Sequence, residues 1–343
     1  MTNSHPTELL PWHKDIYENL CRLNSRQTLA HAYLLEGQKG LGKLTLAKHF
    51  GHYMLCDSPR DMQPCGECGA CHLLAANTHP GLKLIEPEEK SRNIKIDQVR
   101  ALLEYMATTS LRGERKVIII SPAEGLNTNA ANALLKGLEE PAAGTLLLLV
   151  SHQPAQLMAT IKSRCQRLSF MRPETEQAKA WLESKNVRTP AQTLLNLANG
   201  APLRALHLAD EDALHERGVL HKVLEQLLSG KLHVVEAAVE CAKFSISDNI
   251  EGMMLCIADV LEFNQAGQQG QLRDPELAGL ANSLTGKDTI KALHHCYQDL
   301  QKVREALNST ANPAPQLILE SIFYTWSRLK GAEGIERTEG TRI

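Results

Sequence analysis

The sequence is poor in aromatic residues and has no long apolar segment. Phenylalanine, tryptophan and tyrosine together make up 4% of the 343 residues. The sequence has no run of roughly 18 apolar residues, which a membrane-spanning helix would need. Its N-terminal stretch also lacks the pattern of a secretory signal. We therefore expect a cytoplasmic protein with no membrane partner, in which abundant alanine and leucine favour helices.

An excess of charge of one sign is also missing. The chain has 37 Lys and Arg against 39 Asp and Glu, which gives a formal net charge of −2. Domains that bind nucleic acid strongly by themselves usually carry a large positive excess. Composition therefore argues against an autonomous nucleic-acid-binding protein, and the length allows two or three domains.

Disulfide bonds are not expected, because the chain is predicted to be cytoplasmic and its nine cysteines cannot all form pairs. Four of them lie close together in the sequence, as Cys56, Cys65, Cys68 and Cys71. Four thiolates at such spacing are typical of a structural zinc site. An iron–sulfur cluster and a redox pair are the alternatives, and neither has supporting residues nearby. The other five are predicted to pack as small apolar side chains: Cys21, Cys165, Cys241, Cys256 and Cys296.

A glycine-rich loop follows the first apolar strand, which is expected at residues 31–36. Residues 37–43 fit the pattern G-x-x-x-x-G-K, with Gly37, Gly40, Gly42 and Lys43. Glycines let the backbone approach a phosphate, amides at a helix N-terminus point at the anion, and the lysine adds positive charge. The sequence predicts a loop of the phosphate-binding kind.

The residue after this loop does not suit a magnesium–nucleotide complex. The pattern normally continues with Ser or Thr, whose hydroxyl binds magnesium, but Leu44 stands there. Thr45 lies about 100° further around the helix and should miss the metal. We expect no magnesium here and only weak support for ATP binding; a loop kept for its shape alone is the alternative.

Five segments are predicted to be strands of one parallel sheet. The central one, Val117 to Ile120, is apolar and β-branched, as expected for a strand buried on both faces. A helix follows it and stops at Pro141. The others are residues 31–36, 82–85, 145–151 and 166–170. Strands that alternate with helices after a phosphate loop predict a doubly wound α/β P-loop domain.

The predicted domain organisation has three parts and a tail. The P-loop domain covers residues 1–171 and includes the cysteine-rich insertion at about 56–71. Three short helices are expected over 172–209, and an all-α bundle over 210–332, where leucines and the Met253–Met254 pair recur at helical spacing. Residues 333–343 are predicted to be a frayed polar tail.

Two smaller expectations concern single side chains. Trp12 is predicted to pack as an aromatic anchor. Asp97 is predicted to cap a helix that begins at Gln98, with its carboxylate accepting from free backbone N–H groups.

Two motifs resemble the AAA+ clamp-loader family. Residues 133–141 (ALLKGLEEP) resemble its NALLKxLEEP box, and Ser163-Arg164-Cys165 resembles its SRC triplet. The resemblance covers nearly the whole chain and is strongest over residues 31–171. In hydrolysing relatives the central strand ends in Asp-Glu, whereas Ser121 and Pro122 stand here. The resemblance therefore implies a hydrolysis site that has lost its chemistry.

The resemblance also implies an architecture and a function. It implies an AAA+ domain, a small helical lid and a helical collar that oligomerises, with a four-cysteine insertion in the place found here. Arg164 would be an arginine finger that acts in trans on a neighbour's ATP, and Arg204 would be the second sensor arginine of the lid. The implied role is a non-hydrolysing stator of the DNA polymerase III clamp loader in DNA replication. Its partners would be gamma/tau-like ATPase and delta-like subunits, the sliding clamp and primed DNA.

Two other functions stay open on the sequence. The chain could be an active AAA+ ATPase subunit in which Thr45 and Glu124 replace the lost groups. It could also be a zinc-bearing nucleic-acid module that works alone, which the net charge disfavours.

Overall fold

The computed structural model describes residues 8–88, 91, 93–108, 115–266, 271–307 and 314–329. The predicted tail at 333–343 lies outside this part of the chain. The chain folds into two compact units. The first comprises residues 1–186 and 200–205, and the second comprises residues 187–199 and 206–343.

The first unit is built on a five-stranded parallel sheet with the order β2-β3-β4-β1-β5. The strands are β1 (Ala32–Glu36), β2 (Leu82–Ile85), β3 (Lys116–Ile120), β4 (Thr145–Ser151) and β5 (Gln166–Ser169). The predicted α/β class and parallel sheet are confirmed, although β5 ends one residue earlier than expected. Because all strands are parallel, their carboxyl ends lie along one edge of the sheet, where ligands of such folds bind.

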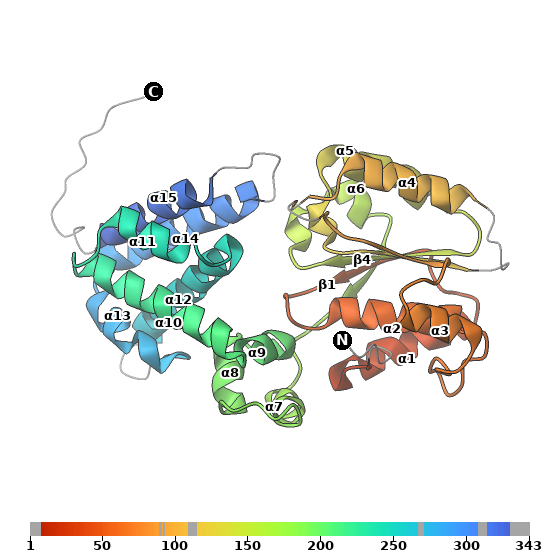
Figure 1. The fold of residues 1–343 in the computed structure, drawn as a ribbon, viewed down its shortest axis with the longest axis horizontal. Helices are drawn as coiled ribbons and strands as arrows, with labels where there is room; N and C mark the ends of the chain where they lie inside the picture. Colours follow the sequence, from red (N-terminus) through yellow and green to blue (C-terminus); the bar gives the residue numbers. More distant parts are fainter. Residues whose placement is uncertain are drawn as a thin grey trace. The chain divides into compact units, whose positions relative to one another are not determined.

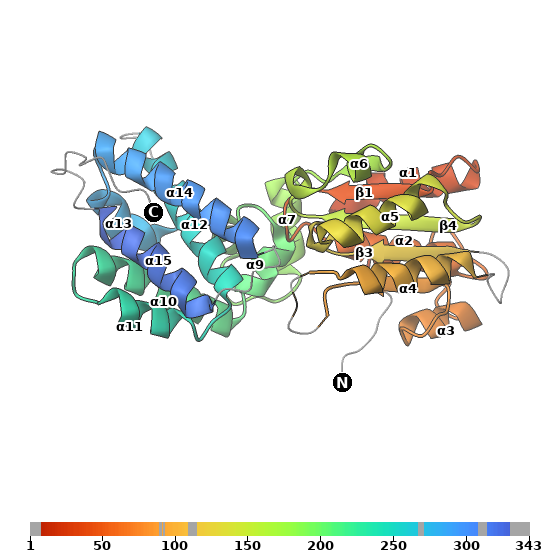
Figure 2. The same cartoon turned by 90° about the horizontal axis from the view of Figure 1, so that it is seen from above.

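Helices cover both faces of this sheet (Figure 1). One face carries α1 (Lys14–Ser25), α2 (Lys43–Leu55) and α3 (Gly69–Ala75), and the other carries α4 (Ile96–Ala107), α5 (Thr128–Glu139) and α6 (Ala159–Lys162). Figure 2 shows α4 and α5 running over the strands. Alternate strand residues serve the two layers: Tyr33 and Leu35 belong to one apolar cluster and Leu34 to the other. This explains why the central strands are apolar at every position.

The start of α4 differs from the prediction. The helix begins at Ile96, so Asp97 lies inside its first turn and does not cap it. The backbone N–H of Lys95 donates to the side-chain oxygen of Gln98 instead, over 3.0 Å.

Three short helices follow the sheet, as expected for residues 172–209. They are α7 (Thr175–Glu183), α8 (Ala191–Leu197) and α9 (Pro202–Leu208). Helix α7 belongs to the first unit, where Trp181 meets Trp12 edge to face at 5.2 Å between ring centroids. Trp12 is thus the aromatic anchor that the sequence predicts. Helix α8 belongs to the second unit, and α9 begins in the first unit and ends in the second.

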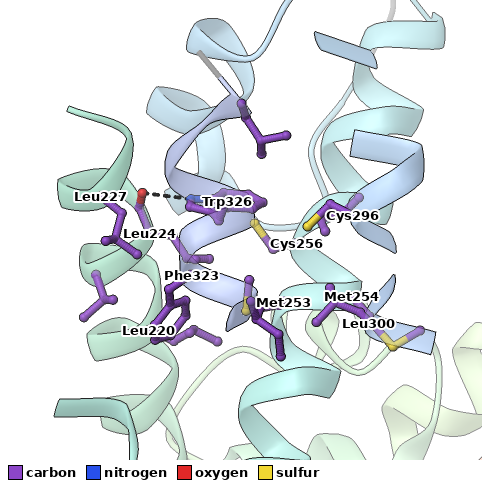
Figure 3. Close-up of a cluster of buried hydrophobic side chains, with 14 of the residues drawn as sticks. Leu220, Leu224, Leu227, Met253, Met254, Cys256, Cys296, Leu300, Phe323 and Trp326 are labelled. Carbon is purple, nitrogen blue, oxygen red and sulfur yellow. Dashed lines mark hydrogen bonds between the residues drawn. The ribbon is translucent and has the colours of Figure 1, made fainter. Parts of the chain in front are cut away.

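The second unit is all-helical in the part of the chain described. After α8, its helices are α10 (Glu211–Leu228), α11 (Val234–Cys241), α12 (Ile246–Ala266), α13 (Ala278–Ser283), α14 (Lys287–Leu307) and α15 (Pro315–Ser327). Trp326 and Phe323 of α15 lie in one apolar interior with leucines of α10 (Figure 3). Met253 and Met254 are buried in the same interior, which confirms their assignment as core residues.

The five scattered cysteines are all buried, as their apolar role predicts. Within the ranges described, no helix combines the length and apolarity needed to cross a membrane.

Candidate functional site

The glycine-rich loop connects β1 directly to α2, at the carboxyl edge of the sheet. Gly37, Gly40 and Gly42 all have positive φ angles, of 149°, 86° and 85°. L-residues rarely adopt such backbone angles, so the loop requires glycine at these positions. Gly42 is the N-cap of α2, and Lys43 is its first residue.

Lys43 is folded back into the loop. Its side chain is buried, and Nζ donates to the carbonyl oxygens of Gly37 (2.6 Å) and Gln38 (2.7 Å). Burial lowers the pKa of Lys43 to about 8, against an opposing effect from the carboxylate of Glu124. In this arrangement the ammonium group binds the loop's own backbone, and a phosphate would have to displace these two contacts.

Three other segments approach the glycines closely. A methyl group placed on Gly42 would lie 2.3 Å from Cδ1 of Leu10, and one on Gly37 would lie 2.6 Å from the carbonyl oxygen of Phe170. On Gly40 it would lie 2.9 Å from Cβ of Arg204. The glycines therefore allow the N-terminal segment, the end of β5 and the start of α9 to cover the loop.

Arg204 therefore lies beside the loop. The backbone N–H of Leu203 donates to the carbonyl oxygen of Gly40 over 3.0 Å, which fixes the start of α9 on the loop.

The N-terminal segment is fastened to the loop by two ring nitrogens. Nε1 of Trp12 donates to the carbonyl oxygen of Leu41 over 2.9 Å, and Nε2 of His13 lies 2.8 Å from the same oxygen. Since a carbonyl only accepts, Nε2 of His13 carries the proton. His13 is fully buried, and burial lowers its pKa to about 4. Nothing in the sequence pattern singled out this histidine.

The carboxyl end of the central strand carries no acidic group. Buried Ser121 and then Pro122 follow β3, at the positions of the family's Asp-Glu pair. Glu124 comes after them, and its Oε1 accepts from the backbone N–H of His152 over 2.9 Å. Its Oε2 is buried without a hydrogen-bond partner. Glu124 therefore places a carboxylate beyond the end of this strand and not at it.

The helix side of the site lacks the hydroxyl that loops of this pattern use to bind magnesium. Leu44 packs against the apolar cluster of the α1–α2 face. Because Leu44 follows Lys43, that position has no hydroxyl, and Thr45 lies one residue further on, partly buried on α2. Magnesium prefers several oxygen ligands in octahedral geometry, which these residues do not provide.

Arg164 makes its contacts away from the glycine-rich loop. It follows α6, and its Nη2 donates to Oε1 of Glu139 over 2.5 Å. Its Nη1 donates to the carbonyl oxygen of Thr160 over 3.0 Å. The side chain is 34% exposed. This contact joins the Leu-Glu-Glu-Pro segment, residues 138–141, to the SRC triplet, which lies elsewhere in the sequence.

The four predicted metal ligands come together. The Sγ–Sγ distances are 3.9 Å for Cys56–Cys68, 3.9 Å for Cys65–Cys71 and 3.6 Å for Cys56–Cys71. A tetrahedral site with zinc–sulfur bonds of about 2.3 Å has edges of about 3.8 Å. The four sulfurs therefore fit zinc in size and number.

Backbone N–H groups also point at these sulfurs. The N–H of Cys65 donates to Sγ of Cys56 over 3.2 Å, and those of Cys68 and Cys71 donate to the preceding ligand sulfur over 3.4 Å each. Such donors stabilise negative thiolates, which are the metal-binding form of cysteine.

The cysteine-rich insertion is attached to both neighbouring helices. The hydroxyl of Tyr17 on α1 donates to the carbonyl oxygen of Met62. Nε2 of His49 on α2 lies 2.8 Å from Oε1 of Gln63. The geometry of the cluster is therefore coupled to the α1–α2 face of the sheet.

A glycine-rich loop that joins the first strand of a five-stranded parallel sheet to the helix after it defines a P-loop α/β protein. A family model described as "DNA polymerase III, delta subunit" matches residues 12–174, and one for its C-terminal part matches residues 211–328. The DNA polymerase III subunit delta' of Pseudomonas aeruginosa is 36% identical over 335 residues, covering 94% of this chain and 99% of the relative. The chain belongs to the DNA polymerase III subunit delta' family.

A second sequence relative agrees with this assignment. The DNA polymerase III subunit delta' of Escherichia coli is 30% identical and covers 91% of this chain and 93% of that protein. Among solved structures, a gamma subunit-related protein of Thermotoga maritima covers 92% of this chain and 99% of its own length. Its identity is 19% and its TM-score is 0.40, so the family assignment rests on the sequence relatives.

Proposed function

We propose that this clamp-loader subunit hydrolyses no nucleotide and supplies Arg164 to the ATP site of a neighbouring ATPase subunit. One contrast carries the proposal. The chain's own site has Ser121, Pro122 and Leu44 where magnesium and water would be held, whereas the guanidinium of Arg164 is partly exposed. The chain would therefore act as a stator.

The chemistry of such a finger is electrostatic. In phosphoryl transfer, charge develops on the oxygens of the transferred phosphate, and a guanidinium from another subunit stabilises it. Arginine suits this role because it is always charged and presents N–H groups in a planar fork.

The partners proposed are those of a DNA polymerase III clamp loader in the cytoplasm. They are gamma/tau-like ATPase and delta-like subunits, the sliding clamp, and primed DNA held within the complex. With a net charge of −2, this chain would contact DNA as part of the assembly and not by itself.

We further propose that Cys56, Cys65, Cys68 and Cys71 hold a structural Zn²⁺. A zinc ion would link the insertion into a closed four-thiolate site, with no position left for a reacting water. The N–H groups directed at the sulfurs and the attachment to Tyr17 support a structural role.

The test is the steady-state ATPase activity of the reconstituted loader with Arg164→Ala in this chain. Loss of a finger typically costs a factor of about 10³ or more at its own site. Because other sites would keep turning over, we expect a partial loss of total ATPase activity and a larger loss of clamp loading. Arg22→Ala, on the exposed side of α1, is the control. An unchanged rate with Arg164→Ala would contradict the proposal.

One observation favours a second candidate, an active ATPase subunit. The buried Oε2 of Glu124 has no hydrogen-bond partner among the described residues, so it is available to accept a hydrogen bond from a reacting group. This candidate requires magnesium-dependent ATP turnover by the purified chain, abolished by Lys43→Ala. The stator proposal requires that the purified chain has no such turnover.

A further inference from the structure

We infer that Glu139 is a positioning residue that holds the guanidinium of Arg164 in place for its work on the neighbouring subunit. Glu139 is the last residue of α5 and stands 25 residues before Arg164 in the chain. The inference rests on the proposed function of Arg164 as a finger.

The guanidinium is held at three points. Nη2 donates to Oε1 of Glu139 over 2.5 Å, and Nη1 donates to the carbonyl oxygen of Thr160 over 3.0 Å. A third contact, between Nη1 and Oγ of Ser163, measures 3.4 Å. Arginine has five N–H bonds, so Nε–H and one N–H of Nη2 keep no partner in the described structure. These two groups remain for a phosphate oxygen.

The end of α5 is an unfavourable place for acidic residues. Glu139 and Glu140 lie at the C-terminus of the helix, where the macrodipole disfavours negative charge. The guanidinium of Arg164 offsets this at Glu139. Glu140 makes no ion pair within the described part of the chain. Residues that are locally unfavourable are often found at functional sites.

The position of Glu139 is itself fixed by the core. The preceding residue, Leu138, is buried in the same apolar cluster as Ile161 of α6. Helices α5 and α6 contact each other through this cluster. Glu139 and the backbone of Thr160 are therefore held on one rigid support, and Arg164 is bound between them.

Holding the Arg164 side chain in place should affect the rate of clamp loading more than the folding stability of this chain. The Glu139 and Arg164 side chains are 50% and 34% exposed, and ion pairs this open contribute little to folding. Misplacing a catalytic group by about 1 Å, in contrast, can cost up to 100-fold in rate. A finger that is already oriented avoids this loss.

The experiment compares reconstituted loaders that carry variants of this chain: Glu139→Ala, Glu139→Gln, Arg164→Ala and Glu139→Ala with Arg164→Ala. Glu140→Ala is the matched control, because it removes the adjacent carboxylate, which makes no ion pair with any described residue. The readouts are clamp-loading rate, kcat and KM for ATP. Thermal unfolding and assembly of each variant are measured alongside.

We expect Glu139→Ala to slow clamp loading by roughly fivefold, as for one lost charge-assisted hydrogen bond, with the KM for ATP unchanged. Glu139→Gln should keep most of the rate, because its amide oxygen still accepts from Nη2. The double variant should match Arg164→Ala alone, since Glu139 acts only through the arginine.

Different results overturn different statements. A normal or faster rate with Glu139→Ala, beside a slow Arg164→Ala loader, would refute the positioning role and leave the finger intact. A further loss in the double variant would also refute it. A normal rate with Arg164→Ala would refute the proposed function itself.

Discussion

The indole N–H of Trp12 donates to the carbonyl oxygen of Leu41, and this contact fastens the segment before α1 to the glycine-rich loop. His13 contacts the same oxygen, and Leu10 lies beside Gly42. The loop is therefore stabilised by residues about 30 positions earlier in the chain. Its shape depends on that segment, whether or not a nucleotide binds.

Gly42→Ala should destabilise the protein. The added Cβ would lie 2.3 Å from Cδ1 of Leu10 and 2.8 Å from Cε1 of His13, at a φ angle of 85°. We expect the free energy of unfolding, measured in urea, to fall by about 1–3 kcal/mol. Gly218→Ala, inside α10 with open space around it, is the control and should raise stability by about 0.5–1 kcal/mol. Equal effects of the two substitutions would contradict the prediction.

Stability should fall as the pH drops below 6.5. The pKa of His13 is about 4 in the folded protein, against 6.5 in the unfolded chain, so below pH 6.5 the unfolded state binds more protons. The contribution of neutral His13 is complete above pH 6.5 and is lost as the pH falls towards 4; it amounts to ~3 kcal/mol. Urea unfolding curves at pH 7.5, 6 and 5 measure this loss.

His13→Gln should flatten that pH dependence, because a glutamine amide can donate to Leu41 but does not titrate in this range. Burial lowers the pKa of His52, His152 and His221 as well, so some dependence should persist. A variant with the full pH dependence of the unaltered protein would show that His13 does not contribute.

Removing zinc should loosen the α1–α2 face of the sheet. We expect one zinc ion per chain by elemental analysis, lost on treatment with a strong chelator or in Cys68→Ser. The thermal midpoint should fall with it, because the insertion is attached to Tyr17 and His49. Chelator should not lower the midpoint of Cys68→Ser any further. A metal-free protein with an unchanged midpoint would contradict the structural role.

Trp326→Ala should be among the most damaging changes in the second unit. Trp326 is fully buried, and its Nε1 donates to the carbonyl oxygen of Leu224 over 3.0 Å (Figure 3). The cavity should cost about 3–5 kcal/mol in the free energy of unfolding. Leu317→Ala on the same helix, where the side chain is 65% exposed, should change it by less than about 0.5 kcal/mol. A denaturant titration that monitors the unfolding of the second unit measures both changes in free energy.

The sheet was predictable because its strands are distinctive in the sequence. Val117 to Ile120 and Leu146 to Val150 are apolar at every position, which only strands buried on both faces require. The cap of α4 was not predictable, because a tertiary contact decides it. The N–H of Ile94 donates to the carbonyl oxygen of Gly125 over 2.7 Å, which fixes the backbone before the helix starts.

The candidate sites were predictable where their residues are close in sequence. The spacing of the glycines and of the four cysteines is enough to identify both groups from the sequence. The partners of Leu41 and Arg164 stand 29 and 25 residues away, and no local pattern connects them. Glu139 could have been singled out from the sequence, since two glutamates at the C-terminal end of a helix are unfavourable to its dipole.

The two units are interwoven along the chain, which passes between them after residues 186, 199 and 205. A fragment that ends at residue 186 would lack residues 200–205, including Leu203, whose N–H donates to Gly40, and Arg204, which lies against the same glycine. It would expose the glycine-rich loop where the intact protein covers it. Nucleotide binding by such a fragment would therefore not show by itself that the intact chain binds nucleotide.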